Sequence, residues 1–472
     1  MVRKHNDEGV GMEGSEKQKT DDRWHNSYYA NAVASGANSP MTPLFFTDVL
    51  GGTVGEAGMM MSGSSVVAVP ASILWGELSD KLKKRKIFVL IGFLGLAISL
   101  FLMGLSSEKF HYIAFVLLLG FLGAASAPIS TVLVMETSEK KEWPRMVGHL
   151  NKTMGLGHVA GLFIGVVWLG FIVSFIETKM SLRLFMLICG AIGLVAVFLA
   201  IAFIDEPKKK IEKRHYIHDV AIASRTIIER ARYAPRARYH FPKIRDIKHL
   251  KRHGVTFDHQ LTRFFVAAAI FFIGFNVFLM PLPIFLKQEL GASYPYVFLI
   301  YMGCSLVGAF MYPKAGDWIV KYGVKKIQLG ATTARAVVIP MMGITGYYIL
   351  NYPTNILPFL DNRQLAILSV CILNLLSGFC WAMISISFIS TVSYLAPESA
   401  KGEAMGIYTG MNGFGSIAGA LIGGMLAQTF GFKTVFFASS AFIIAGILLT
   451  ASLRINLDNI QTEKQNNEKI EV

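Results

Sequence analysis

Charged residues and cysteines are both scarce in this chain of 472 residues. Charged side chains make up 16% of it and hydrophobic ones 53%, whereas about 25% charged residues is usual for a soluble domain. All four cysteines lie within apolar stretches, which argues against a disulfide framework. The first 23 residues are polar and hold no segment of the signal-peptide kind. The composition is that of an all-α membrane protein whose N-terminus we expect in the cytoplasm.

Motifs for catalysis, nucleotides and metals are missing as well. The sequence has no cluster with metal-ligand spacing, no phosphate loop followed by lysine and threonine, and no nucleophile elbow. We therefore expect no enzyme activity, no metal and no cofactor, and any active function should be driven by gradients. A net charge of +14 would suit nucleic acid, but the cations gather in alternate connections between apolar stretches. We therefore expect the lipid bilayer, and no nucleic acid, as the partner of these cations.

Apolar stretches of about 20 residues, long enough to cross a bilayer as helices, recur along the chain. We predict twelve spans with approximate bounds 26–48, 56–76, 87–106, 110–135, 146–171, 183–204, 262–287, 295–313, 327–350, 364–394, 403–428 and 433–453. The first is the least apolar. By the positive-inside rule, the basic connections and both tails, 1–25 and 454–472, face the cytoplasm. The sequence thus predicts an integral multi-pass protein of the cytoplasmic (plasma) membrane, with both termini inside.

Segment 205–261 is the one long polar stretch between spans, and it separates a predicted bundle at 26–204 from another at 262–453. Apolar residues recur at helical spacing from Ile217 to Ala231, with charged residues on the other face. This pattern predicts an amphipathic helix along the membrane. A plain basic linker is the favoured interpretation, and a regulatory or anionic-lipid-binding element is the alternative.

The two predicted bundles are similar in sequence. At an offset of 240 positions, identical residues face each other, namely Pro43 and Pro283, Gly51 and Gly291, Gly76 and Gly316, and Lys81 and Lys321. At an offset of 258, the glycines from Gly148 to Gly165 match those from Gly406 to Gly423. A constant offset across a loop and both flanking helices indicates parallel copies of a six-helix unit.

Residues 76–86, between the second and third predicted helices, read G-E-L-S-D-K-L-K-K-R-K. They resemble the loop of major facilitator superfamily transporters, whose pattern is G-x-L-x-D-(R/K)-x-G-(R/K)-(R/K). The matching residues are Gly76, Leu78, Asp80, Lys81, Lys84 and Arg85, whereas Lys83 replaces the second glycine. The copy in the second half keeps Gly316, Lys321 and Gly323 but has Val320 at the acidic position. The resemblance implies two six-helix bundles around a midplane substrate site.

The resemblance also implies a gate. Asp80 stands at a helix end, where it can accept hydrogen bonds from the positive N-terminus of the helix at 403–428. We expect a clamp that closes the cytoplasmic side and breaks when the halves rock, formed by Gly76, Asp80, Lys81, Lys84, Arg85, Gly316, Lys321 and Gly323. A basic turn that only sets membrane topology is the alternative.

Family resemblance places helices 1, 4, 7 and 10 around the cavity, and polar residues share one face of helices 1 and 10. Arg335 lies deep in the ninth helix, where a charge is by default a functional hypothesis, although a long side chain can snorkel. We predict a substrate site formed by Asn31, Ser35, Asn38, Asn276, Asn374, Trp381, Ser385 and Arg335. Hydrogen bonding between helices is the alternative for each of them.

Two helices carry glycine at every fourth position, which lets backbones approach closely. The predicted packing residues are Gly157, Gly161 and Gly165 in one helix and Gly415, Gly419 and Gly423 in the other. The spacing resembles the antiporter signature of drug-exporting members. The proline expected after the third glycine is, however, Leu162 in one half and Ala420 in the other, so close packing is the favoured explanation.

We therefore predict a monomeric secondary transporter that moves a small organic solute by alternating access. Export of amphipathic compounds is favoured, because the predicted cavity is mostly apolar and lacks the charges that an organic-anion carrier would need. An uptake permease for a sugar or other metabolite is the alternative, and a non-transporting sensor would need an added signalling domain. Proton coupling is common in the family. Asp48 and Glu136 are its weak candidates here, and facilitated diffusion stays open.

Overall fold

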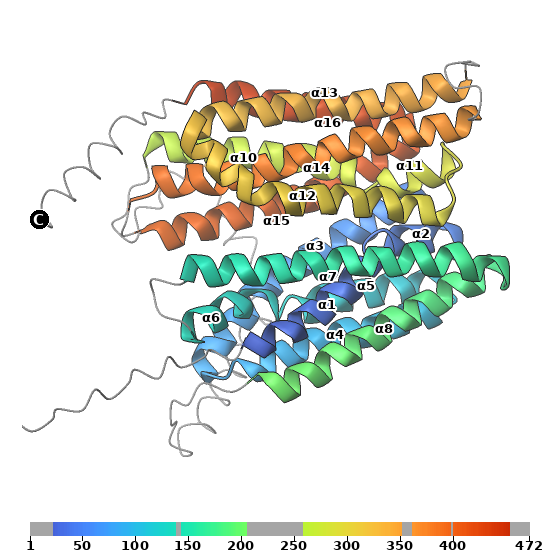
Figure 1. The fold of residues 1–472 in the computed structure, drawn as a ribbon, viewed down its shortest axis with the longest axis horizontal. Helices are drawn as coiled ribbons and strands as arrows, with labels where there is room; N and C mark the ends of the chain where they lie inside the picture. The colour runs from blue at the N-terminus through green and yellow to red at the C-terminus, as the bar shows by residue number, and fades with distance from the viewer. Residues whose placement is uncertain (1–21, 138–142, 205–257, 352–360, 398–399, 454–472) are drawn as a thin grey trace, which may run out of the picture.

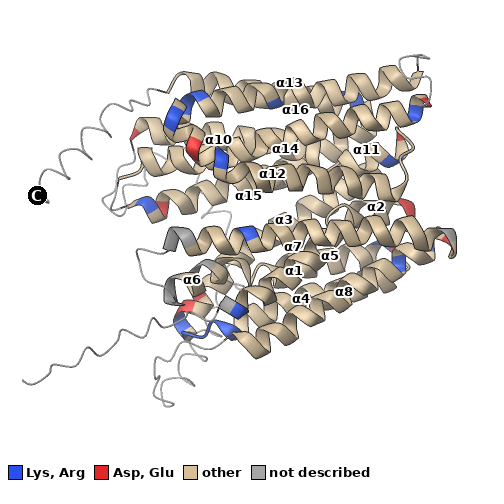
Figure 2. Ribbon diagram, viewed as in Figure 1, with Lys and Arg blue, Asp and Glu red and all other residues tan. Residues whose placement is uncertain are grey.

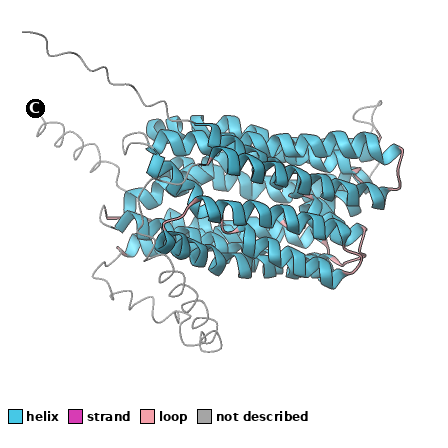
Figure 3. Cartoon of the chain, turned by 90° about the horizontal axis from the view of Figure 1, so that it is seen from below, coloured by secondary structure: helices cyan, strands magenta, loops and turns pink. Residues whose placement is uncertain are grey.

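The computed structural model describes residues 22–137, 143–204, 258–351, 361–397 and 400–453, and every regular element within these ranges is a helix (Figures 1 and 3). Three-residue 3₁₀ segments precede α1 and follow α7. The α-helices are α1 (His25–Asn38), α2 (Met41–Asp48), α3 (Val54–Leu82), α4 (Lys86–Leu105), α5 (Lys109–Gly123), α6 (Ala127–Thr137), α7 (Trp143–Phe171), α8 (Thr178–Phe203), α10 (His259–Leu279), α11 (Leu282–Gln288), α12 (Tyr294–Tyr322), α13 (Val324–Asn351), α14 (Asn362–Leu395), α15 (Lys401–Phe430) and α16 (Phe432–Ala451).

In the described chain, eleven helical segments are long and apolar enough to cross a membrane. The predicted first span is divided into α1 and α2 and is not among the eleven. The break falls just before Met41, at Pro40, and a similar break at Pro281 separates α10 from α11. Proline lacks the amide hydrogen that continues a helix, and its ring clashes with the preceding turn. The all-helical fold predicted from the sequence is therefore confirmed.

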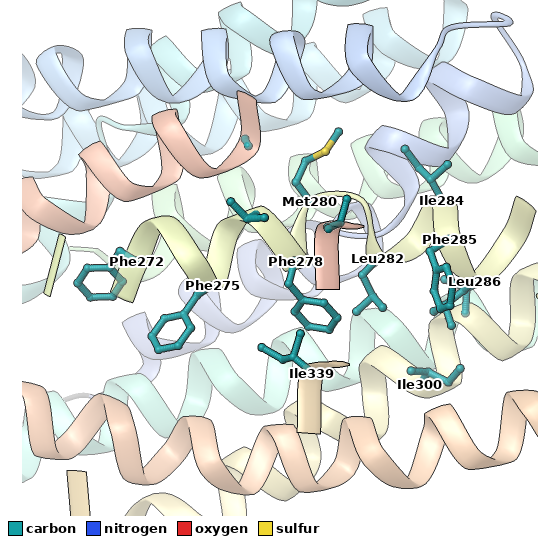
Figure 4. Close-up of a cluster of buried hydrophobic side chains, with 14 of the residues drawn as sticks. Phe272, Phe275, Phe278, Met280, Leu282, Ile284, Phe285, Leu286, Ile300 and Ile339 are labelled. Atoms are coloured by element: carbon teal, nitrogen blue, oxygen red, sulfur yellow. The ribbon is translucent and has the colours of Figure 1, made fainter. Parts of the chain in front are cut away.

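The helices form two bundles, α1 to α8 and α10 to α16, which lie side by side in Figure 1. Across the boundary, α3 packs on α15 and α7 packs on α12, with a smaller contact between α2 and α11. In the second bundle the core is rich in phenylalanine along α10 and α11 (Figure 4). The ring of Phe285, for example, lies 4.7 Å from that of Phe436.

The internal repeat is visible in the backbone. Gly51 and Gly291 both have positive φ, +68° and +63°, a region that costs glycine little because it has no Cβ. Each glycine follows the same hydrogen bond, from the amide of Leu50 or Leu290 to a carbonyl five residues earlier, at 3.3 Å in both halves. The sequence identities at offset 240 thus mark equivalent turns.

The two ends of the molecule differ in charge. We call the end where α3 meets α4 and α12 meets α13 the basic end, and the end of the α2–α3 and α11–α12 turns the far end. Lys and Arg gather mainly at the basic end in Figure 2. The basic residues that occupy alternate connections in the sequence thus lie together at one end of the helices.

At the basic end, α3 and α12 extend beyond their predicted bounds, to Leu82 and Tyr322. Both helices are longer than predicted because their last two turns are polar and do not continue the apolar pattern. The predicted 76–86 connection is therefore mostly helix, with a turn of three residues. Lys83 in this turn has φ +50°, and Gly323 in the second copy has φ +88°. The second glycine of the motif thus corresponds to a left-handed position, which lysine occupies in the first half.

Some predictions fall on residues that the structure does not describe. The amphipathic helix predicted from Ile217 to Ala231 lies outside the described residues; of segment 205–261 only the last four positions are described. The two tails, up to residue 21 and from residue 454, also lie outside them. The side chain of Glu136 is likewise not described.

Candidate substrate cavity and gates

A cavity of about 660 Å³ lies between the two bundles. Its described lining comes from α3, α7, α10, α11, α12, α13, α14 and α15 and from Ser39 and Pro43 at the α1–α2 break. The volume is in the range of pockets that hold drug-sized molecules. Much of the wall is aromatic or aliphatic, including Phe272, Phe275, Leu279, Met280 and Leu282. Phe272, Phe275, Met280 and Leu282 follow one another along α10, the break and α11 (Figure 4).

Four of the eight predicted substrate residues line this cavity: Asn276, Arg335, Asn374 and Trp381. The Asn276 amide donates to the carbonyl of Phe272 at 2.8 Å, one turn earlier in α10. The Asn374 amide donates to the carbonyl of Ile300 at 3.1 Å and so joins α14 to α12. Both amides keep a carbonyl oxygen as an acceptor, since each bond uses only the nitrogen.

The other four predicted residues, Asn31, Ser35, Asn38 and Ser385, are not among the described lining residues. Asn38 is buried, and its side-chain oxygen accepts from the Thr42 hydroxyl at 2.9 Å. The Ser385 hydroxyl donates to the carbonyl of Trp381 at 2.8 Å. For these two residues the hydrogen bonds lie within one predicted span, one turn apart, and so differ from both the cavity position and the bond between helices that the sequence left open.

The set of cavity helices differs from the one implied by the resemblance. No described lining residue comes from α5 or α6, which make up the fourth predicted helix. Ser126 lies just before α6 and packs beside Gly92 of α4. A Cβ built on Gly92 would lie 2.7 Å from the Cβ of Ser126. Helix α6 is thus held against α4 through this small pair, away from the described cavity wall.

Sequence reasoning missed the contributions of α12 and α15. Tyr301, Ser305 and Tyr312 line the cavity from α12, and Asn412 and Ser416 from α15. Their spacings of four, seven and four residues place each set on one helical face. The polar-stripe criterion that was applied to helices 1 and 10 would have found both sets.

Arg335 is the charged residue of the cavity wall. Its side chain is 5% exposed, and its guanidinium carbon lies 4.6 Å from the ring centre of Phe275 and 4.9 Å from that of Trp381. The two rings come from α10 and α14. His158 faces the same cavity from the first bundle. Among the described residues no group of three His, Cys, Asp or Glu could hold a metal ion.

At the far end the two bundles meet partly through backbone atoms. A Cβ built on Gly58 of α3 would lie 2.7 Å from the carbonyl oxygen of Ala420 and 2.8 Å from the Cα of Gly424, both in α15. Such distances leave no room for a methyl group. The Thr53 hydroxyl also donates to the side-chain oxygen of Gln428 at 3.0 Å. This contact seals the far end of the α3–α15 pair.

A second contact at the far end uses charge. The Tyr294 hydroxyl of α12 donates to a carboxylate oxygen of Asp48 in α2 at 2.8 Å. The Lys287 ammonium lies 4.2 Å from the centre of the Tyr294 ring, a cation–π distance. Asp48 therefore joins the two bundles through a hydrogen bond to an ionised group, the stronger kind.

The glycine stripes lie where backbones come together. Gly157 and Gly161 face α1, where a Cβ on Gly161 would overlap the carbonyl oxygen of Val33. Gly415, Gly419 and Gly423 face α10 in the equivalent way, and Gly165 faces the ring of Phe298 across the bundle boundary. All six glycines thus lie at contacts too close for a side chain, as close helix packing requires.

The predicted clamp residues lie at the basic end, and Asp80 is paired there within its own half. A carboxylate oxygen of Asp80 accepts from the Arg85 guanidinium at 2.7 Å, although the Asp80 side chain is 69% exposed. Arg85 is buried and also donates to the Ser79 hydroxyl. Around Gly76 and Gly316 there is open space where a Cβ would lie, as there is at Gly402 beside the start of α15. Lys81 and Lys321 are exposed.

This arrangement defines a class of protein: a polytopic helical membrane protein built from two copies of a six-helix unit around a central cavity. A model of the Major Facilitator Superfamily matches residues 27–360 and 357–470. The chain belongs to this family, which is one of transporters rather than enzymes, and is an integral multi-pass membrane protein.

Individual relatives are distant. The chain is 29% identical over 132 residues to a staphyloferrin B transporter of Staphylococcus aureus, which covers 27% of this chain and 31% of that protein. It is 26% identical over 185 residues to the multidrug resistance protein MdtG of Citrobacter koseri, covering 38% of this chain and 43% of the relative. The matched part thus spans less than half of these curated relatives. Its fold is similar to that of the crystal structure of the nucleoside transporter NupG, with a TM-score of 0.67 and 13% identity over 92% of this chain and 99% of that one.

Proposed function

We propose that this chain is a gradient-driven secondary transporter that moves a small organic solute across the cytoplasmic membrane by alternating access. The observation that carries the proposal is the cavity between the bundles together with the contacts that close its far end. A solute bound between two bundles that touch at one end is reached from the other end. Rocking of the bundles would exchange the accessible side, as in other carriers built from repeats.

The distribution of charge supports an orientation for this cycle. Lys and Arg gather at the basic end (Figure 2), and positive residues concentrate in cytoplasmic connections. In the proposed orientation the basic end lies in the cytoplasm, and this conformation holds the cavity closed to the outside. Both termini are then cytoplasmic.

The clamp at the basic end acts in the opposite conformation. We assign Asp80 the role of accepting from the first amides of α15 when the bundles close at this end, with Lys81, Lys84 and Lys321 beside it. Its present bond to Arg85 joins an exposed carboxylate to a neighbour in the same turn. Such a pair contributes about 0–1 kcal/mol, so exchanging one partner for the other costs little.

At the far end, the Asp48–Tyr294 bond supports a role for Asp48 in coupling. Protonation would turn a charged acceptor into a neutral one and weaken the bond that joins α2 to α12. In the proposed cycle a proton on Asp48 therefore favours opening of the far end. Asp48 thus has a carboxylate hydrogen bond that joins the two bundles.

Two observations support amphipathic organic compounds as substrates. The cavity wall is largely aromatic and aliphatic with a few amides and hydroxyls, and one relative is by its name a multidrug resistance protein. A siderophore transporter is also among the relatives. Export from the cytoplasm is the direction that this combination favours, and we expect the transporting unit to be the monomer.

The test is a thermal-shift screen of the purified chain against amphipathic drugs, sugars and organic acids, because ligands that bind the native state stabilise it. Each compound that binds is then followed in proteoliposomes with and without an imposed proton gradient. We expect an amphipathic compound to bind and to be moved uphill. Binding confined to sugars would contradict the substrate class, and binding without any flux would contradict the transporter itself.

A further inference from the structure

Arg335 has hydrogen-bond donors that nothing in the described chain uses. The Nε and Nη1 atoms are buried and have no acceptor within the described residues, and the whole residue is 5% exposed. A guanidinium carries five N–H donors and keeps its charge at physiological pH. A buried charge without a partner costs several kcal/mol, so this arrangement is expected only where a partner arrives later.

The surroundings of Arg335 hold it in place without neutralising it. Phe275 and Trp381 lie on it at 4.6 and 4.9 Å, and their ring faces attract a cation. They accept no hydrogen bond in the guanidinium plane, so the Nε and Nη1 donors stay unpaired beside the cavity that Arg335 lines. The rings also hold the side chain at the middle of α13, eleven residues after the helix begins at Val324, which argues against snorkelling to the basic end.

The cavity supplies no counter-charge. Its described lining contains no Asp, Glu or Lys, and its other titratable groups are His158, two tyrosines and Cys304. The described ion pairs, Arg85 with Asp80, Lys109 with Glu56 and His111 with Glu108, all lie near helix ends. The negative partner of Arg335 must therefore come from a molecule that enters the cavity.

We propose that Arg335 is the anion subsite of this cavity and that the transported solute is an organic monoanion, a carboxylate attached to an apolar, planar body. The proposal rests on the proposed transport function and specifies its substrate class. A carboxylate matches the planar fork of a guanidinium with two parallel hydrogen bonds. The amides of Asn276 and Asn374 and the tyrosine hydroxyls add neutral polar contacts, and the phenylalanines of α10 accommodate the apolar body.

The charge balance selects a carboxylate over a phosphate monoester. The described cavity lining holds one permanent cation, Arg335, which neutralises one negative charge, whereas a phosphate monoester carries about −1.5 to −2 at pH 7. A cation is disfavoured further, because like charges repel strongly in a cavity of low dielectric constant. Arg335 thus reverses the expectation from sequence that the cavity lacks the charge an organic-anion carrier needs.

The experiment uses the purified full chain and four probes with one ring system: 1-naphthaleneacetate, its neutral amide 1-naphthaleneacetamide, the cation 2-(1-naphthyl)ethylamine, and 1-naphthyl phosphate. Binding constants come from the rise in thermal midpoint with probe concentration. We expect the acetate to bind more tightly than the amide by about tenfold or more, as charged hydrogen bonds predict. The phosphate should bind more weakly than the acetate, and the amine most weakly.

Variants separate the subsite from a structural role. Arg335→Gln should weaken the acetate to the level of the amide and leave the Kd of the amide unchanged. Arg335→Lys keeps the charge without the fork and should give an intermediate Kd for the acetate. Arg363→Gln removes an exposed arginine at the far end and serves as the matched control, with no change for any probe.

Several results would overturn the proposal: equal affinities of the wild type for the acetate and the amide, tighter binding of the phosphate or the amine, or no binding of the acetate at millimolar concentration. An acetate preference that survives Arg335→Gln would do so as well. Flux of the same probes in proteoliposomes keeps the two proposals apart. Acetate that binds but is not transported would contradict the proposed transport function and would not affect the proposed anion subsite. Amide or amine transported as fast as acetate contradicts the subsite and leaves transport standing.

Discussion

The two ends of the α3–α15 pair present different chemical groups. At the far end the helices touch through Gly58 and Gly424, backbone against backbone. At the basic end the same helices present the Asp80 carboxylate, several cations and glycines with open space around them. Backbone contact depends on the absence of added atoms, whereas a charged contact depends on its partner and on the solvent. Steric fit therefore governs one end and electrostatics the other.

Among the substitutions that test this difference, Gly58→Leu should have the largest effect. A side chain at this position has no space, because even a Cβ would lie 2.7 Å from the carbonyl oxygen of Ala420. Overpacking of this kind costs about 1–3 kcal/mol or more, and the far end should then stay open. We expect transport to fall to background while the chain still folds as two bundles.

Cys304 gives a direct measurement of this effect, because it lines the cavity. With the other three cysteines replaced by serine, a membrane-impermeant thiol reagent should label Cys304 from the far side only in the Gly58→Leu variant. Gly330→Leu is the control, since Gly330 is exposed on α13 and has open space where a Cβ would lie. Normal transport by Gly58→Leu, with Cys304 unreactive from the far side, would show that the glycine contact is not a gate.

Asp80→Asn tests the electrostatic end and should have the next largest effect. In the present pair the Asp80 carboxylate is exposed, and the buried Arg85 also has the Ser79 hydroxyl as a partner, so the thermal midpoint should change little. A clamp to α15 in the other conformation would lose a charge-assisted bond of about 1.5–3 kcal/mol, which corresponds to roughly a tenfold or larger fall in the transport rate. Flux and thermal midpoint are measured on the same preparation. Unchanged flux would mean that the basic residues at 76–86 only set the membrane topology.

Lys83→Gly should have the smallest effect of the three substitutions, and it should stabilise the protein instead of impairing it. Lys83 has φ +50°, a conformation that costs an ordinary residue about 1–2 kcal/mol and costs glycine little. The variant should therefore raise the thermal midpoint slightly. Lys81→Gly makes the same chemical change inside α3, where glycine lowers helix stability by about 1 kcal/mol. Equal shifts for the two variants would mean that charge, and not backbone conformation, decides stability in this turn.

The fold could be predicted from the sequence because its signals are local. Apolar stretches predicted the eleven spans, and identities such as Gly51 with Gly291 indicated two parallel copies of a six-helix unit. The ends of α3 and α12 could not be predicted in this way. Their last two turns are polar, and a polar helix end outside the apolar layer looks like a loop in a hydropathy pattern.

The site was only partly predictable, because a polar stripe does not say which neighbour it faces. Asn38 and Asn374 occupy similar stripes, yet Asn38 bonds to Thr42 on its own segment and Asn374 lies in the cavity wall. The repeat was no guide to Arg335 either. The offset of 240 aligns it with Gly95, where a Cβ would collide with Leu122. The charge is a feature of one copy, and its isolation emerges only from the packing of three helices.

The glycine contact at the far end has a further consequence, for the kinetics of the proposed cycle. Burying a long side chain at an interface costs up to about 2 kcal/mol of conformational entropy, whereas glycine has no rotamers to lose. Where Gly58 meets Gly424, closing immobilises no side chain and opening releases none. Such a seal adds little entropic barrier in either direction, so it can form and separate at every turnover without slowing the carrier.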